Sequence, residues 1–69
     1  MKETAIFGRN LEALRKKRGL TQARLAEALD ISLPHYFYLH TGKRAPSWLL
    51  LLKIRQVLKC KLSALLKGV

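Results

Sequence analysis

Residues 22–39, QARLAEALDISLPHYFYL, constrain the fold more than any other stretch, because their pattern requires two short helices to cross within them. Small Ala26 stands where the two helices would touch, and Asp30 between them is a residue type that tolerates a left-handed backbone. The apolar positions that would bury one side of both helices are filled by Leu25, Leu29, Tyr36 and Leu39. The spacing predicts a helix-turn-helix motif.

Helix signals on both sides of this motif predict five short helices in all. Phe7, Leu11 and Leu14 recur at helical spacing, and Gly19 ends that first helix because glycine readily adopts the left-handed conformation. Thr21 can cap a second helix, and Ser32 with Pro34 can start a third at about residues 33–40, which Gly42 ends. Ser47 can cap a fourth helix from residue 48, and a last short helix is expected near 62–66. No strand signal occurs, so we expect an all-α, compact five-helix fold in a single domain spanning residues 1–69.

The charge of the chain favours a polyanionic partner. Fourteen Lys and Arg oppose four Asp and Glu, giving a net charge of +10, and residues 31–69 hold seven of the basic residues and no acidic one. Nucleic acid is the first candidate, and an anionic membrane surface is the second. Charges interrupt the apolar residues 48–66, so we expect neither membrane insertion nor a signal peptide. The single cysteine, Cys60, allows no internal disulfide, which points to the cytoplasm.

The sequence gives no support for an enzyme or a metal site. His35 and His40 would lie about 140° apart around a helix, and one remote cysteine does not complete a ligand set. No nucleophile is accompanied by a base and an orienting acid, and the four glycines form no phosphate-binding loop. We therefore expect no catalytic residue, no metal and no cofactor.

The chain resembles the Cro/repressor-like, or XRE, helix-turn-helix family over about residues 7–66. The resemblance is carried by three runs in the family's order and spacing, LRKKRGLTQARLAEALDIS, TGKRAPS and LLKIRQVLKCKLSALL. It implies a five-helix domain that binds an operator in double-stranded DNA, usually as a symmetric homodimer, with the third helix in the major groove. The resemblance thus implies a transcriptional regulator, of repressor type in our interpretation.

The resemblance also assigns roles to individual residues. It places Gln22 at a phosphate, Ser32, Leu33, Pro34 and Tyr38 near base edges, and Lys43 and Arg44 of the loop 41–47 on phosphates. Further candidates for contacts to DNA are His35 and Phe37, with Arg15 and Thr21 as candidates for phosphate contact. For Gln22, Lys43 and Arg44 the alternative is an ordinary solvated cap or loop.

The third helix departs from the family in its chemistry. Leu33, Pro34 and Phe37 cannot exchange hydrogen bonds with base edges, so they can touch only a thymine methyl group or a sugar. An exposed apolar cluster is also typical of a protein-binding surface. An alternative function therefore stays open, in which the fold serves as a protein-interaction module, such as an antitoxin or a regulatory subunit, with weak or no reading of bases.

A second departure concerns an ion pair within the domain. His40 stands where the family normally has a glutamate that pairs with an arginine of the first helix, here Arg15. Without that carboxylate, Arg15 must pair with Glu12, stay solvated or reach a phosphate.

The last departure is the apolar character of the fourth and fifth helices. A homodimer interface would cover this surface, and its expected members are Trp48, Leu49, Leu62, Leu65 and Leu66. The alternative is a core that repacks around Trp48.

Overall fold

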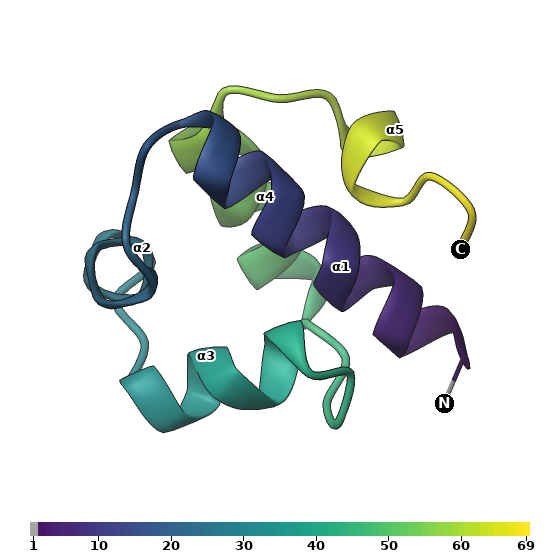
Figure 1. Ribbon diagram of the computed structural model, residues 1–69, viewed down its shortest axis with the longest axis horizontal. Helices are drawn as coiled ribbons and strands as arrows, with labels where there is room; N and C mark the ends of the chain where they lie inside the picture. The colour runs from purple at the N-terminus through teal and green to yellow at the C-terminus, as the bar shows by residue number, and fades with distance from the viewer. Residues whose placement is uncertain (1) are drawn as a thin grey trace.

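A computed structural model describes residues 2–69 and contains five helices in that range (Figure 1). They are α1 (Lys2–Lys17), α2 (Gln22–Ala28), α3 (Leu33–His40), α4 (Trp48–Leu58) and α5 (Leu62–Leu65). No strand occurs in the described part of the chain. The all-α, five-helix fold is confirmed.

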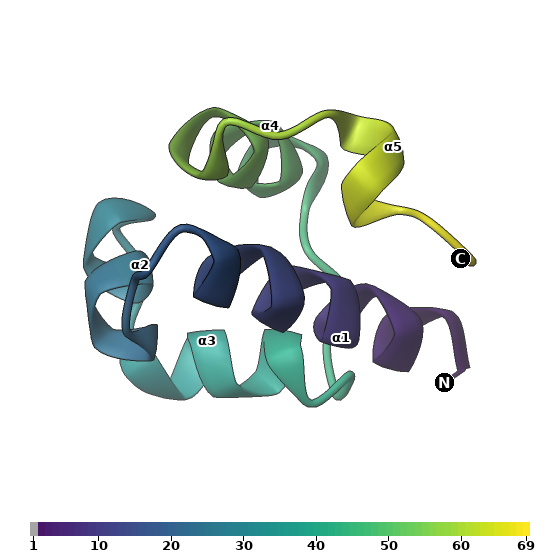
Figure 2. The same cartoon turned by 45° about the horizontal axis from the view of Figure 1, so that its top comes forward.

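Helix α1 forms the middle layer of the molecule. Figure 2 shows α3 on one side of it and α4 with α5 on the other, while α2 closes one end. The side chains that meet between these layers are Phe7, Leu11, Leu25, Ala26, Leu29, Tyr36, Leu39, Leu51, Ile54, Leu58 and Leu65. All five helices contribute to one core, and burying such side chains is the main term that stabilises a chain of this size.

Side-chain caps start three of the helices as the sequence predicts. The hydroxyl oxygens of Thr21, Ser32 and Ser47 each accept a hydrogen bond, at 3.1 Å, from the backbone N–H three residues later. Asp30 adopts the left-handed conformation with φ of 58°, which turns the chain between α2 and α3. The helix-turn-helix geometry is therefore encoded locally by its caps and its turn.

Two side chains of α1 and its C-terminal turn hold the ends of α4 and α5. Arg18 donates from Nε to the Leu58 carbonyl at 2.6 Å and from Nη2 to the Lys59 carbonyl at 2.9 Å. Asn10 donates from Nδ2 to the carbonyl of Leu65, the last residue of α5, at 2.8 Å and to that of Lys67 at 2.9 Å. The last carbonyls of a helix have no partner within it, so these bonds fix α4 and α5 against α1.

Helices α1 and α3 approach so closely that only glycine fits at one crossing point. A Cβ atom on Gly8 would lie 2.3 Å from the His40 carbonyl oxygen and 2.9 Å from that of Leu39. Both are backbone atoms, which cannot rotate away. The absence of a side chain at residue 8 therefore sets the distance between α1 and α3.

We predict that Gly8→Ala destabilises the fold by about 3 kcal/mol, because the added methyl group forces α1 and α3 apart. Gly19→Ala is the control, since its new Cβ meets nothing within 4 Å and only the backbone conformation, with φ of 70°, is unfavourable. That control should lose about 1 kcal/mol. Urea unfolding of both variants measures the difference, and equal losses would contradict the close-approach argument.

Candidate nucleic-acid interface

Helix α3 turns an exposed surface to solvent, formed by Ser32, Leu33, Pro34, Phe37 and Tyr38, and we call this set the α3 surface. Leu33 and Phe37 are each 49% exposed and Tyr38 is 39% exposed. The predicted packing residues of the same helix, Tyr36 and Leu39, are fully buried. The orientation predicted from helical periodicity is therefore confirmed, and His35 lies half-buried at the margin.

The loop 41–47, which we call the basic loop, is attached to the C-terminal half of α3. The backbone N–H groups of Lys43 and Arg44 both donate to the Tyr38 carbonyl, at 2.9 and 3.1 Å. The Arg44 guanidinium lies over the Tyr38 ring, 5.1 Å from its centre, in a cation–π contact. The two cations are thus presented beside the α3 surface and both are exposed.

The start of the basic loop is clamped to α1. Thr4 donates from its hydroxyl to the Gly42 carbonyl at 2.7 Å, and a Cβ on Gly42 would lie 2.7 Å from the Ala5 Cα. Gly42 has φ of 80°, a conformation that favours glycine. The loop therefore leaves α3 in a direction that α1 dictates.

The two cap hydroxyls are exposed and chemically suited to phosphate. Thr21 and Ser32 each accept a backbone N–H through the hydroxyl oxygen, which leaves the hydroxyl proton able to donate to an anion. Gln22 is different, because its Nε2 donates to Glu12 Oε1 at 2.5 Å. A phosphate contact from the Gln22 amide would have to compete with that bond.

Glu12 is the centre of a polar network beneath the interface. It pairs with Arg15, whose Nε lies 2.5 Å from Oε2, and His40 Nδ1 lies 3.2 Å from its other oxygen. Arg15 also donates to the Leu20 carbonyl, and its side chain is only 12% exposed. Of the alternatives open for Arg15, the structure shows pairing with Glu12. A phosphate contact by Arg15 stays a prediction, and it would have to compete with the bonds of Nε to Glu12 and of Nη1 to the Leu20 carbonyl.

The network controls the charge of its members. Burial alone would raise the pKa of Glu12, but hydrogen bonds from Arg15 and Gln22 and the positive charge of Arg15 lower it below its ordinary value. Burial, together with the negative charge of Glu12, raises the pKa of Tyr36. At neutral pH the site therefore contains an ionised Glu12 beside a neutral Tyr36.

Sequence reasoning identified the Glu12–Arg15 pair only as one option and missed that Glu12 also holds α2 and α3. The bonds to Gln22 and His40 join three helices at one carboxylate. Two features of the sequence could have indicated this network. Glu12 stands one turn before Arg15, and His40 stands where the family has a glutamate.

The structure also corrects the expected dimer interface. Leu65 is fully buried in the core, so it has no surface to offer a partner, while Leu62 and Leu66 are partly buried against that core. Trp48 is 61% exposed and Leu49 is 77% exposed. The alternative of a core repacked around Trp48 is therefore wrong, and the start of α4 presents an apolar surface.

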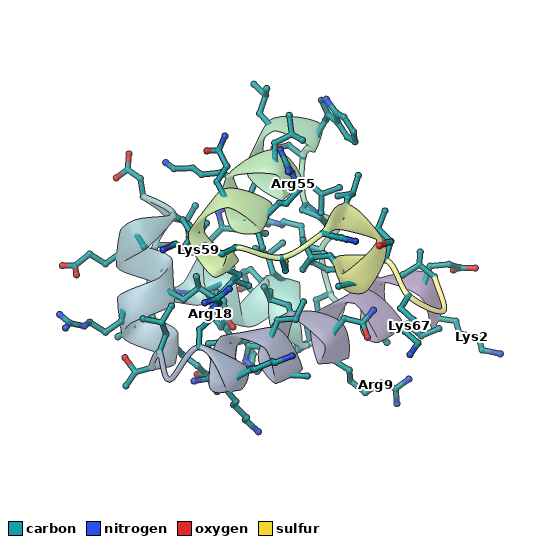
Figure 3. All side chains as sticks on the ribbon, turned by 90° about the horizontal axis from the view of Figure 1, so that it is seen from above. Lys2, Arg9, Arg18, Arg55, Lys59 and Lys67 are labelled. Atoms are coloured by element: carbon teal, nitrogen blue, oxygen red, sulfur yellow. The ribbon has the colours of Figure 1, made fainter. Side chains whose placement is uncertain are left out.

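Positive charge is not confined to the α3 side of the molecule. Figure 3 views the protein from the side of α4 and α5, and labels cations on or just after α1 and α4 and in the C-terminal segment, namely Lys2, Arg9, Arg18, Arg55, Lys59 and Lys67. Figure 1 places α3 on the opposite side. The field of the whole protein can therefore attract a polyanion, but contacts at the site depend on the few cations placed there.

An open cavity of about 340 Å³ lies where the ends of α1 and α4 meet α5, away from α3. Cys60 lines it, and burial raises the pKa of that thiol. Among residues 2–69 no three His, Cys, Asp or Glu side chains gather in a way that could hold a metal ion. None of the helices in this range is both long and apolar enough to cross a bilayer.

Comparisons with known proteins agree with this geometry. Residues 11–65 match the helix-turn-helix family. The chain is 38% identical over 63 residues to an uncharacterized HTH-type transcriptional regulator, YqaE, of Bacillus subtilis (strain 168), an alignment that covers 91% of this chain and 54% of that protein. The chain thus spans about half the length of this curated relative.

Two solved structures have the same fold. The restriction-modification controller protein C.AhdI from Aeromonas hydrophila superposes with a TM-score of 0.87 at 26% identity, covering 94% of this chain and 98% of that one. The clp gene regulator ClgR from Corynebacterium glutamicum gives a TM-score of 0.86 at 27% identity, covering 91% of this chain and 67% of that one.

We predict that Glu12→Gln lowers the free energy of unfolding by about 2 kcal/mol near neutral pH, because the charge-assisted bonds to Arg15 and His40 are weakened. The folded-state pKa of Glu12 is depressed from 4.5, so its contribution is present above that pH and is lost as pH falls through the folded value. The difference between native protein and variant should therefore shrink in acid. Denaturant melts from pH 3 to 7 measure it.

The matched control for this prediction is Glu27→Gln, which changes an exposed carboxylate of α2. It should alter stability by no more than about 0.5 kcal/mol. A Glu12→Gln variant as stable as the control at neutral pH would contradict the role of the network.

Proposed function

The chain belongs to the helix-turn-helix family, in its XRE branch, and we propose that it is a sequence-specific DNA-binding transcriptional regulator of repressor type. The observation that carries the proposal is the exposed α3 surface with two cations fixed at its end through the Tyr38 carbonyl. The named relatives support it, since they are called a transcriptional regulator, a controller protein and a gene regulator.

In the proposed complex α3 lies in the major groove and the basic loop follows the phosphate backbone. Ser32, Leu33, Pro34 and Tyr38 approach base edges, with His35 and Phe37 at the groove walls. Lys43 and Arg44 bind phosphates, and the capping hydroxyls of Thr21 and Ser32 add neutral donors. Gln22 binds a phosphate when its amide leaves Glu12. While it keeps that bond, it holds α2 against α1. Occupying the operator would block polymerase.

A symmetric homodimer completes the proposal. The apolar start of α4, Trp48 and Leu49, is uncovered, and the partly buried Leu62 and Leu66 can extend the contact. Covering Leu49, which is 77% exposed, would be favourable for association. Two α3 helices in such a dimer would read half-sites about one helical turn apart.

The proposed function is tested by gel-shift titration on DNA fragments selected from a random pool. We expect affinity to fall steeply with salt concentration, because binding releases counterions from the phosphates. Replacing both Lys43 and Arg44 by Ala should weaken binding to every sequence to a similar degree and reduce the salt slope by about two. Filter binding at four salt concentrations measures both quantities.

Lys61→Ala supplies the matched control, since Lys61 is an exposed cation on the connection to α5, remote from α3. It should leave the salt slope almost unchanged. A protein that shows no preference among sequences, or whose binding is indifferent to salt, would refute the proposed function.

The dimer is tested separately by Leu49→Lys, which places a charge in the proposed contact. We expect the variant to sediment as a monomer where the native protein sediments as a dimer, with its helical content unchanged. Leu33→Lys makes the same substitution at an exposed leucine of α3 and should leave the sedimentation unaltered. A native protein that stays monomeric at millimolar concentration would dismiss the homodimer.

A further inference from the structure

We infer that the α3 surface reads its operator mainly through the 5-methyl groups of thymine, so that the protein distinguishes thymine from uracil at the same positions. This inference rests on the proposed function and specifies which chemical group of the DNA that site recognises. A thymine shows the major groove one acceptor and one methyl group, and only the methyl group is recognised by apolar contact.

The side chains available on the α3 surface favour that reading. Leu33 and Pro34, in the first turn of α3, carry no donor or acceptor beyond the backbone, and Phe37 has none either. Leu33 and Phe37, four residues apart on one side of the helix, are each half exposed, which leaves apolar area ready to be covered. Hydrogen bonds to bases are therefore left to Ser32, His35 and Tyr38.

The surface is also restrained, which favours a methyl contact because a gap of about 0.5–1 Å already loses a quarter to a half of the dispersion attraction. Ser32 caps the first turn through the His35 N–H. The Phe37 ring packs edge-on against the His40 ring, with centres 5.3 Å apart, and His40 is tied to Glu12. The cation–π contact with Arg44 restrains Tyr38 in turn.

Charge around the α3 surface argues for DNA as its occupant rather than an apolar protein surface. Lys43 and Arg44 are exposed beside it, and no acidic residue occurs in the chain from residue 31 onward. A hydrophobic protein partner would have to cover or neutralise both cations. A duplex offers an apolar methyl group within reach of negatively charged phosphates, which matches the arrangement of this surface.

The test replaces each thymine of the selected operator in turn by deoxyuridine, which deletes the methyl group and keeps every hydrogen-bonding group. We expect affinity to fall about fourfold for each contacted methyl group, the loss that corresponds to one buried methylene-sized group. Replacing the same T·A pair by a 5-methylcytosine·G pair returns a methyl group to that position, so this operator should bind more tightly than the one with an unmethylated C·G pair there. Substitutions in the flanking DNA should have no effect.

Variants of the protein assign the effect to its residues. Leu33→Ala should weaken binding to the native operator and abolish the deoxyuridine effect at one thymine, with circular dichroism confirming that the helices persist. Lys43→Ala is the matched control, since it should weaken binding while keeping the full fourfold sensitivity. Loss of methyl sensitivity in both variants alike would overturn the assignment to α3.

The outcomes separate this inference from the function on which it rests. Sequence-specific binding that is indifferent to deoxyuridine would overturn the inference and leave the regulator intact, with reading by hydrogen bonds from His35 and Tyr38. Such a result, combined with a Phe37→Ser variant that binds DNA normally, would leave the apolar residues to a protein partner. Absence of any sequence preference would overturn both proposals.

Discussion

The contact between α1 and α3 determines most of what this protein presents to solvent. Gly8 lets the backbone of α3 approach α1 closely near His40, and Thr4 holds the basic loop at Gly42. Because Tyr36 and Leu39 are buried by the same contact, the opposite side of α3 must face outward. A five-helix domain this small has little apolar core to spare, so one crossing that fails would release both α3 and the basic loop.

The polar network at Glu12 joins α1, α2 and α3 at one carboxylate. The family's pairing of a glutamate on the third helix with Arg15 is replaced by a glutamate on the same helix as Arg15, and His40 now bridges from α3 to that carboxylate. The carboxylate is ionised, since its pKa is lowered by Arg15 and Gln22 despite burial. His40 Nδ1, 3.2 Å from Glu12 Oε1, therefore links α3 to α1 at this carboxylate.

Much of the site followed from local patterns in the sequence. The bounds of α3, its cap at Ser32, the left-handed Asp30 and the outward direction of Leu33, Phe37 and Tyr38 were all predicted, because each depends on residues within one or two turns. Three contacts were not predicted, or were predicted only as one option. They are the stacking of Arg44 on Tyr38, the hydrogen bond from Arg18 to the end of α4, and the pairing of Arg15 with Glu12. Such contacts depend on how the helices pack, because packing decides which side chains meet. Packing also decides which of several possible partners a side chain takes.

The sequence by itself determined the five helices, their order and most of the residues that pack in the core, because helix periodicity and capping act over a few residues. It also determined an excess of positive charge. The tertiary structure alone decided which apolar residues of the C-terminal helices stay exposed, placing Leu65 in the core and Trp48 and Leu49 outside. It likewise decided that Lys43 and Arg44 are fixed beside α3 while other cations lie on the side of α4 and α5, since the direction of a side chain in space depends on how complete helices cross.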